Sequence, residues 1–456
     1  MNLDRIHNIY FLGIGGIGMS AIARYFNALG KNVAGYDRVS RPLTDMLRSE
    51  GIVVNFDSHV ESIPDEFKNK ENTLVVVTPA IPKSLSQLNY FLKQGFNIKK
   101  RSEILGLISE TGQCIAVAGT HGKTTITTMI AYFMQQSRVG CNAFLGGISK
   151  NFGTNLVVNP QSEIMVVEAD EFDRSFLHLK PRNAIISAID ADHLDIYENK
   201  NAVEDAFKQF IHQIKPGGTL IIKSGLNLDI INRDDINFFT YSLKGDADFR
   251  AENIRIDNGL YVFDFMGDNI KIQGLQLGLP GLINVENAVA AIAMAYLNGA
   301  HQDEIYNSVS KFKGIERRFD YQINRNDFIY IDDYAHHPEE LKATIGSVRE
   351  LFKDKKITGV FQPHLYSRTR DFAGEFAKSL ELLDEVILLD VYPAREEPIP
   401  GVTSEIIFEK INKKDKVICT KDNVMGYLKN KKPEVLITLG AGDIDELVNP
   451  IKEFFQ

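Results

Sequence analysis

The stretch from Cys114 to Thr125, CIAVAGTHGKTT, constrains the fold more than any other part of the chain. Ile115 to Ala118 are apolar or small and predict a buried strand, and the turn from Gly119 to Gly122 leads into a helix that we expect to end near residue 136. Backbone N–H groups of such a turn and of the helix N-terminus bind phosphate, and the side chain of Lys123 adds a positive charge. The hydroxyl of Thr124 can bind Mg²⁺. The stretch therefore predicts a site for a nucleotide polyphosphate.

The glycine spacing of this turn differs from that of the common phosphate-binding loop, G-x-x-x-x-G-K-[ST], because Val117 occupies the position of the first glycine. The loop is therefore shorter. A purely structural turn between a strand and a helix would account for Gly119 and Gly122. It would not account for Lys123 followed by two threonines at the start of a helix, so we favour phosphate binding.

A second glycine-rich turn follows the first expected strand of the chain, Ile9 to Leu12. The turn, Gly13 to Gly18, has the pattern G-x-G-x-x-G, and a strand from Asn32 to Tyr36 ends at Asp37, where dinucleotide-binding folds place an acid that binds ribose. Taken alone, these residues are typical of an NAD oxidoreductase. The pattern is weakly specific, because any diphosphate, including that of a UDP-linked ligand, can bind at the same helix N-terminus.

Composition and charge argue against several kinds of partner. The 456 residues include 60 acidic and 51 basic side chains, a formal net charge of −9, without a block of Lys and Arg, so we expect no binding to nucleic acid or to a membrane. Cys114, Cys141 and Cys419 are far apart and form no C-x-x-C pair, which favours a reducing compartment. We find no signal peptide and no run of about 18 apolar residues. These features predict a cytoplasmic protein.

Acidic residues follow two expected strands near the central phosphate turn. Ile164 to Val167 ends at Glu168, and Ile185 to Ile189 ends in the segment 190–195, which contains three acids and His193. A carboxylate at the end of a strand beside a phosphate loop is a common Mg²⁺ ligand. Burying so many charges without a cation would be unfavourable, although an exposed acidic loop remains an alternative. The two strand ends therefore predict a cation site.

Alternating apolar residues from Phe249 to Leu279 predict antiparallel strands, and a helix is expected from Asn287 to Leu297. Asn284 and Asn287 lie three residues apart around the expected helix start, so helix capping is the favoured role for one of them. An amide side chain can also bind the edge of an adenine.

The last third of the chain is a series of expected strands and helices in which polar segments follow the strand ends. Because the carboxyl ends of parallel strands meet at one edge of a sheet, four such segments in succession predict a shared site. The segments are 332–338 (DDYAHHP), 362–370 (QPHLYSRTR), 390–397 and 440–443.

These features predict an α/β protein with three domains. We place the boundaries near Ser109 and Gly314. Residues 1–109 are then a Rossmann-like domain that binds a diphosphate, 110–314 a central P-loop domain that binds ATP, and 315–456 a second Rossmann-like domain.

Together the motifs resemble the Mur ligases of peptidoglycan synthesis, and the resemblance covers the whole chain. The phosphate turn and the H-x-D segment are typical of the family at large, whereas the first turn and the segments after residue 360 resemble the members that add L-alanine. Some positions depart from the pattern: Leu365 stands where an arginine is usual after FQPH, and Leu282 and Ile283 replace a common Arg-His pair. The motifs are GIGGIGMS at 13–20, AGTHGKTT at 118–125, VEADE at 167–171, DADHLD at 190–195, ERRFD at 316–320, DDYAHHP at 332–338, FQPHLYSRTRDF at 361–372 and DVYPAREEPIPGVTSE at 390–405.

The resemblance implies an ATP-dependent ligase that joins L-alanine to UDP-N-acetylmuramate through an acyl phosphate, with Mg²⁺ as the metal. It implies that the first glycine turn binds the UDP-sugar and the second binds ATP. The implied substrate-binding residues are Gly13, Gly15, Gly16, Gly18, Met19, Ser20, Asp37, His364 and Arg368. The implied ATP-binding residues are Gly119, Thr120, His121, Gly122, Lys123, Thr124, Thr125, Asn284, Asn287, Arg318 and Asp333, and the implied metal ligands are Thr124, Glu168 and His193. The implied catalytic residues are Lys123, His193, His336, His364 and Arg368.

Two other classes of protein remain open from the sequence. An NAD-dependent dehydrogenase would explain the first turn and Asp37 but would leave Lys123 without a role. A non-catalytic nucleotide-binding regulator would explain both turns, but not the clustering of Glu168, His193 and Arg368. Within the family, the nearest rival is the murein-peptide ligase, which joins a tripeptide to the same UDP-sugar.

Overall fold

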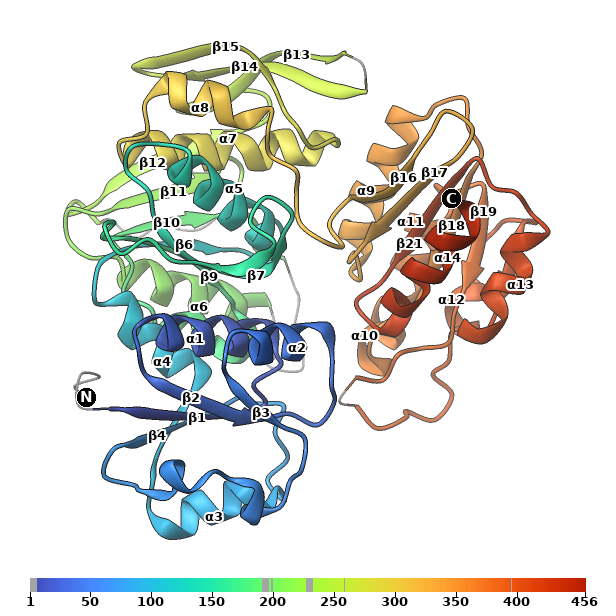
Figure 1. The fold of residues 1–456 in the computed structure, drawn as a ribbon. Coiled ribbons are helices and arrows are strands. Elements are labelled where there is room, and N and C mark those ends of the chain that lie inside the picture. The colour runs from blue at the N-terminus through green and yellow to red at the C-terminus, as the bar shows by residue number, and fades with distance from the viewer. Residues whose placement is uncertain (1–5, 191–196, 198–199, 227–232, 258, 395) are drawn as a thin grey trace. The chain divides into compact units, whose positions relative to one another are not determined.

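The computed structural model describes residues 6–190, 197, 200–226, 233–257, 259–394 and 396–456 (Figure 1). The chain divides into two compact units. One unit consists of Met1–Arg250, Phe265–Ile272 and Ala288–Ser308, and the other of Ala251–Asp264, Gln273–Asn287 and Val309–Gln456. The described strands form three β-sheets.

The first sheet consists of β1 (Asn8–Leu12), β2 (Asn32–Tyr36), β3 (Val53–Asn55), β4 (Thr73–Val77) and β5 (Asn97–Lys100), and its helices are α1 (Ile17–Ala28), α2 (Pro42–Ser49), α3 (Ser86–Gln94) and α4 (Arg101–Ser109). The strands are parallel in the order β3-β2-β1-β4-β5. The strand order reverses beside β1, which is buried along its whole length. Open α/β sheets bind ligands at such a reversal, beyond the carboxyl ends of the strands. The glycine turn after β1 therefore lies where a ligand is expected.

The second sheet has the order β15-β14-β13-β12-β11-β10-β6-β9-β7-β8. Its strands are β6 (Gln113–Ala118), β7 (Asn142–Ser149), β8 (Thr154–Val157), β9 (Ile164–Ala169), β10 (Asn183–Ile186), β11 (Thr219–Lys223), β12 (Asn237–Ser242), β13 (Phe249–Asp257), β14 (Leu260–Gly267) and β15 (Ile270–Gln276), and the helices along this part of the chain are α5 (Lys123–Gln135), α6 (Lys200–His212), α7 (Leu282–Leu297) and α8 (Gln302–Val309). Strand β6 pairs in parallel with both β9 and β10. The phosphate turn, Glu168 and Asp190 therefore lie at the same edge of the sheet, as the sequence predicts.

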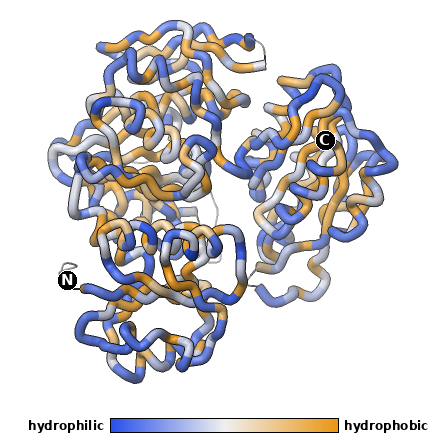
Figure 2. The backbone as a smooth tube through the Cα atoms, viewed as in Figure 1, coloured by the Kyte–Doolittle hydropathy of each residue, from blue (hydrophilic) through white to orange (hydrophobic). Residues whose placement is uncertain are grey.

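The third sheet consists of β16 (Asp320–Asn324), β17 (Ile329–Asp333), β18 (Ile357–Phe361), β19 (Glu385–Leu388), β20 (Lys416–Ile418) and β21 (Val435–Leu439), and its helices are α9 (Pro338–Leu351), α10 (Tyr366–Asp371), α11 (Ala373–Leu380), α12 (Glu405–Phe408), α13 (Val424–Lys429) and α14 (Val448–Phe455). Its order is β16-β17-β21-β18-β19-β20, and only β16 runs antiparallel to its neighbour. The central strands are hydrophobic along their length (Figure 2) and pack helices on both faces. The four polar segments follow β17, β18, β19 and β21, which are adjacent, so the predicted shared edge is confirmed.

Two sequence predictions in the central part of the chain are wrong. Helix α7 begins at Leu282, five residues before the expected start, so neither Asn284 nor Asn287 is the residue that precedes the helix. The positive φ of Gly281, +97°, marks the change of direction just before the helix. Strand β10 ends at Ile186 rather than Ile189. Residues 187–190 leave the sheet because they bond to the phosphate turn instead of to a neighbouring strand.

Candidate functional site

The phosphate turn between β6 and α5 is held by the segment that follows β10. The N–H of Thr120 donates to the carbonyl oxygen of Ala188 over 3.0 Å. Gly119 has a φ of +136°, and a Cβ there would lie 2.2 Å from Oγ of Ser187, so a larger residue would not fit. Gly122, with a φ of +82°, directly precedes α5. The turn thus has a fixed shape at the N-terminus of a buried helix, where phosphate binds in other proteins.

Lys123, the first residue of α5, is paired inside this turn. Its Nζ donates to the carbonyl oxygen of Gly119 over 2.7 Å and lies 2.8 Å from Oε2 of Glu171, whose side chain is only 1% exposed. Burial lowers the pKa of Lys123, but the carboxylates of Glu171, Asp170 and Glu168 outweigh burial and the net shift is upward. The side chain is therefore positively charged at neutral pH.

Glu168, near the end of β9, lies against the backbone of Gly146 in β7. A Cβ at Gly146 would lie 2.0 Å from Oε2 of Glu168, so a larger residue there would displace the carboxylate from this position. Thr124 is buried in the first turn of α5. A hydroxyl and a carboxylate are oxygen donors that suit Mg²⁺ held mainly by the phosphates of a substrate. Among the described residues no three His, Cys, Asp or Glu side chains are grouped to hold a metal by themselves, and His193 lies outside those residues.

Asp190 is the part of the acidic segment that the structure describes, and it bonds to the phosphate turn. Its N–H donates to Oγ1 of Thr120 over 3.1 Å, and the same hydroxyl donates to its Oδ2 over 3.3 Å. Nε2 of His121 lies 3.2 Å from Oδ2. Asp190 therefore supports the turn, whereas residues 191–196 are not described.

The first glycine turn is held by the residues at the end of β2. The N–H of Gly13, whose φ is +87°, donates to the carbonyl oxygen of Tyr36 over 2.8 Å. The N–H of Gly15 donates to Oδ2 of Asp37 over 2.7 Å. Asp37 thus contacts the turn itself, and ribose binding by this residue stays a prediction. Ser20 is fully buried, and its hydroxyl has protein partners, so direct substrate contact by that side chain also stays a prediction.

A cavity of about 270 Å³ connects the first glycine turn with the end of β9. Its lining includes Gly16, Gly18, Met19, Arg101, Glu168 and Asp170. Arg101 begins α4, and its Nη2 lies 3.6 Å from Oδ2 of Asp170. A Cβ at Gly18 would lie 2.9 Å from Nη1 of Arg101, so the guanidinium lies directly over the start of α1. Among the described residues that line the cavity, Arg101 is the only one with a basic side chain.

Asp333, the last residue of β17, organises the first polar segment of the third sheet. Its carboxylate accepts the N–H of Phe319 over 2.6 Å, the N–H of Ala335 over 2.8 Å and the hydroxyl of Thr344 over 3.4 Å. Burial raises the pKa of Asp333 to about 6, although Arg318 and the two N–H groups act in the opposite direction.

Two arginines lie over the ring of Tyr334 in this segment. The guanidinium carbons of Arg317 and Arg318 are 5.1 and 4.9 Å from the ring centroid. Arg317 also donates to the carbonyl oxygen of Gly440 over 2.7 Å, and its Nε lies 3.4 Å from Oδ2 of Asp332. Arg317 therefore ties the segments after β17 and β21 together, while Arg318 is the less enclosed of the two.

The remaining polar segments meet at His364. Its ring stacks on Tyr392 with 5.7 Å between centroids and contacts the ring of His336 edge-on at 5.9 Å. Backbone bonds join the same segments, because Leu365 donates to the carbonyl oxygen of Tyr392 over 2.9 Å. Arg368 follows on α10 and is buried. The structure therefore brings His336, His364 and the helix of Arg368 to one edge of the third sheet.

Asn284 and Asn287 lie on one face of α7, and both are buried. The amide of Asn284 donates to the carbonyl oxygen of Pro280 over 2.6 Å, and that of Asn287 donates to Oδ1 of Asn284 over 3.4 Å. Their assignment to adenosine stays a prediction.

Sequence reasoning missed two residues of the first unit. Arg101 and Glu171 were given no role, although Glu171 belongs to the VEADE motif and directly pairs with Lys123. Glu171 follows β9, and Lys123 follows β6, 48 residues earlier in the chain. Because β9 and β6 are paired in parallel, the two residues come together at the same edge of the sheet.

The fold and the glycine turns define a class of α/β proteins with three sheet-containing parts and a phosphate turn in the middle part. Family models match all three parts: the Mur ligase family, catalytic domain, over residues 8–112; the Mur ligase middle domain over 117–295; and the Mur ligase, glutamate ligase domain, over 317–442. The chain belongs to the Mur ligase family.

Full-length relatives carry one activity in their names. A UDP-N-acetylmuramate–L-alanine ligase of Phocaeicola vulgatus is 50% identical over 452 residues, which is 99% of this chain and 98% of that protein. One of Flavobacterium psychrophilum is 47% identical over 99% of both chains. The crystal structure of the UDP-N-acetylmuramate–alanine ligase of Thermotoga maritima matches with a TM-score of 0.83 at 27% identity, over 98% of this chain and 99% of that one. The expected α/β class with three sheet-containing parts is confirmed.

A murein peptide ligase from Psychrobacter arcticus has the same fold, with a TM-score of 0.69 at 23% identity over 98% of each chain. Among the described residues of this chain, no helix is long and apolar enough to cross a membrane.

Proposed function

We propose that this chain joins L-alanine to UDP-N-acetylmuramate with the hydrolysis of ATP to ADP and phosphate. The observation that carries the proposal is the cavity that has the first glycine turn at one side and Glu168 at the other. A diphosphate at the turn would place the rest of the same substrate toward the end of β9, next to the strand that leads into the phosphate turn. The full-length relatives named for this reaction support the choice of substrates.

We propose three functional parts with boundaries near residues 109 and 314. Residues 1–109 bind the UDP-sugar through Gly13 to Ser20 and Asp37. Residues 110–314 bind ATP through the turn from Gly119 to Thr125. The extents of the three family-model matches support this division.

The chemistry requires two anions to approach each other. A carboxylate does not react with an amine unaided, so the substrate carboxylate first attacks the γ-phosphate of ATP and becomes an acyl phosphate. Lys123, charged and held at the start of α5, offsets the repulsion between carboxylate and phosphate. Thr124 and Glu168 would hold one Mg²⁺, and His193 would hold a second. When bound, Mg²⁺ supplies positive charge to the phosphate oxygens.

Residues of α7 and of the third sheet contribute further contacts in this proposal. Asn284, Asn287 and Asp333 hold the adenosine, and Arg318 holds phosphate oxygens. His336, His364 and Arg368 hold the reacting carboxylates. The gathering of the last three at one sheet edge supports a common role.

The direct test uses purified protein with ATP, Mg²⁺ and UDP-N-acetylmuramate. Each amino acid, or the murein tripeptide, is added in turn, and phosphate release and product mass are followed. L-alanine alone should support turnover. Turnover with the tripeptide but not with L-alanine would instead establish a murein-peptide ligase, and turnover without any added amine would contradict both.

A further inference from the structure

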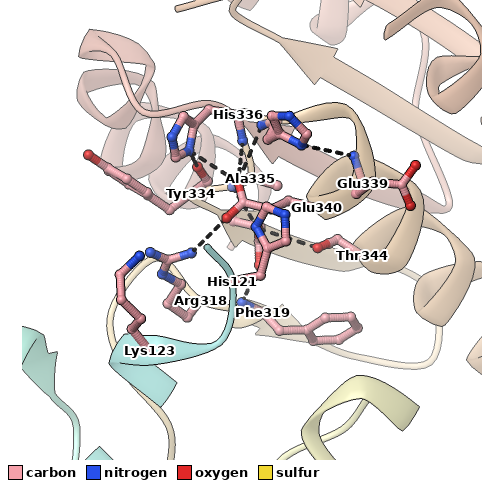
Figure 3. A network of polar contacts seen from close by, with 12 residues as sticks. His121, Lys123, Arg318, Phe319, Tyr334, Ala335, His336, Glu339, Glu340 and Thr344 are labelled. Atoms are coloured by element: carbon pink, nitrogen blue, oxygen red, sulfur yellow. Dashed lines mark hydrogen bonds and ion pairs between the residues drawn. The ribbon is translucent and has the colours of Figure 1, made fainter. Parts of the chain in front are cut away.

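Glu340, the third residue of α9, contacts several groups at the start of that helix (Figure 3). Its Oε2 accepts the backbone N–H of His336 over 3.0 Å and that of His337 over 3.3 Å, and it lies 3.2 Å from Nδ1 of His336. Its Oε1 lies 3.8 Å from Nη1 of Arg318. The side chain is only 15% exposed, so protein groups rather than water surround most of the carboxylate.

Helix capping explains only part of this arrangement. In many helices the third residue accepts the N–H of the residue that precedes the helix, and Gln serves as well as Glu. His337 is that preceding residue here. The contacts of Glu340 with the ring of His336 and with Arg318 lie outside the capping pattern and depend on negative charge. The charge therefore has a role that can be separated from capping.

The contacts of Nδ1 fix the tautomer of His336. This nitrogen lies 3.0 Å from the carbonyl oxygen of Tyr334 and 3.2 Å from Oε2 of Glu340. A carbonyl and a carboxylate only accept hydrogen bonds, so Nδ1 carries a proton and the lone pair of the neutral ring is on Nε2. Two further rings also contact His336 among the described contacts: that of Tyr334, 5.3 Å away between centroids, and that of His364. Arg318 lies on the other side of the Glu340 carboxylate, near Oε1.

The ligation requires a proton acceptor, because L-alanine carries an ammonium group at neutral pH and its nitrogen can attack only after losing a proton. Histidine is the side chain best suited to accept it near pH 7. We propose that Glu340 is a positioning residue that keeps His336 in the Nδ1–H form, so that Nε2 first takes this proton and only then, as an N–H group, donates to the carboxylate that His336 is proposed to hold. The proposal rests on the proposed ligase function.

The step balances without another reactant. One ammonium proton moves to Nε2 and leaves an imidazolium beside the carboxylate of Glu340. The amine nitrogen then bonds to the carbonyl carbon of the acyl phosphate, and the bond from that carbon to the phosphate oxygen breaks. A second proton of the nitrogen leaves on the departing phosphate, so the products are the amide, hydrogen phosphate and protonated His336.

The test compares Glu340→Gln with Glu339→Gln. Gln at position 340 keeps an oxygen that can accept the capping hydrogen bond but removes the negative charge. Glu339, the preceding residue, is the control because its side chain is exposed, with Oε2 lying 3.9 Å from Nζ of Lys342. The carboxylate of Glu340 favours the imidazolium, so its removal lowers the pKa of His336. We expect the rising limb of kcat/KM for L-alanine against pH to move about one pH unit or more toward acid in Glu340→Gln. We also expect the plateau kcat to fall about 10-fold or more, and Glu339→Gln to match the wild type.

A second measurement is independent of activity. Nitrogen chemical shifts of the labelled histidines, with His336 assigned from the His336→Gln variant, should show the Nδ1–H tautomer in the wild type and a lower His336 pKa in Glu340→Gln. An Nε2–H tautomer, or an unchanged pH profile together with a lower Tm in Glu340→Gln, would show that Glu340 only caps the helix and would overturn the proposal. If the wild-type protein fails to ligate L-alanine, that result alone contradicts the proposed function. The tautomer is a separate result: an Nδ1–H form of His336 would still support the positioning role of Glu340.

Discussion

Lys123 at the start of α5 and Glu171 after β9 form an ion pair with 2.8 Å between Nζ and Oε2. The carboxylate of this pair is almost wholly buried, and the lysine also bonds to Gly119 inside the phosphate turn. A bound phosphate would compete with Glu171 for the same ammonium group. The pair therefore connects phosphate binding with the segment that also carries Glu168.

Replacing Lys123 by alanine should lower turnover by about 100-fold or more, because it removes the charge that faces the phosphates. It should also destabilise the protein by about 3–5 kcal/mol, because the buried Glu171 loses its partner. The double variant Lys123→Ala/Glu171→Gln should recover Tm without recovering turnover, which calorimetry and phosphate release would measure. Turnover near the wild-type level in either variant would contradict the role of Lys123.

Replacing Arg101 by alanine should raise the KM for UDP-N-acetylmuramate about 10-fold or more, because charge-assisted hydrogen bonds contribute about 1.5–3 kcal/mol. Arg101 provides the only basic side chain among the described residues that line the cavity. The matched control is Arg48→Ala, which removes an exposed arginine of α2. Initial rates at saturating ATP would separate the two variants, and equal KM values would remove Arg101 from the substrate site.

Asp332 should make stability depend on pH. Burial raises the pKa of Asp332 from an ordinary value of 3.8 to about 6, with Arg317 and the hydroxyl of Thr438 acting in the opposite direction. Between pH 4 and 6 the folded state therefore holds a proton that the unfolded state has lost, so stability falls as pH rises through this window, by about 3 kcal/mol for this group. Calorimetry across this range should show a flatter decline for Asp332→Asn than for the wild type. Parallel curves would show that Asp332 is ionised throughout.

Arg368→Lys should cost about 1.5–3 kcal/mol in kcat/KM, because lysine keeps the charge but loses the planar fork that binds a carboxylate through two hydrogen bonds. Leu365, where related enzymes carry an arginine, lies at the start of the same helix with a φ of +71° and a buried side chain, so it cannot share this role. Arg370→Lys, at an exposed position 2.7 Å from Asp371, is the control. Unchanged kcat/KM for both UDP-N-acetylmuramate and L-alanine in Arg368→Lys would exclude a carboxylate clamp at this position.

Several strands could be predicted from sequence because continuous apolar runs ended at Gly, Pro or acidic residues. The expected bounds of β2 agree with the structure and those of β1 differ from it by one residue, and the four polar segments share one edge of the third sheet as predicted. The start of α7 was misplaced because asparagines suggested a cap, whereas Gly281 supplies the change of direction.

The contacts that complete the candidate site were harder to predict, because they join residues far apart in the chain. Arg101 meets Asp170 across 69 positions, and Arg317 meets Gly440 across 123. The motifs indicated which residues take part in binding or catalysis. The contacts that hold those residues in place depend on which strands are neighbours in the sheets. Glu340 is the exception, because it lies only four residues after His336 and this spacing is visible in the sequence. What the sequence did not indicate is that the negative charge of Glu340 acts on the ring of His336.

The most direct measurement of the central claim uses UDP-N-acetylmuramate labelled with ¹⁸O in its carboxylate, together with ATP, Mg²⁺ and L-alanine. If the carboxylate is activated as an acyl phosphate, one labelled oxygen remains bound to phosphorus when the amide forms. Mass spectrometry of the released phosphate should then show one ¹⁸O atom for each UDP-N-acetylmuramoyl-L-alanine produced. Product formation with unlabelled phosphate, or phosphate release without this product, would contradict the account.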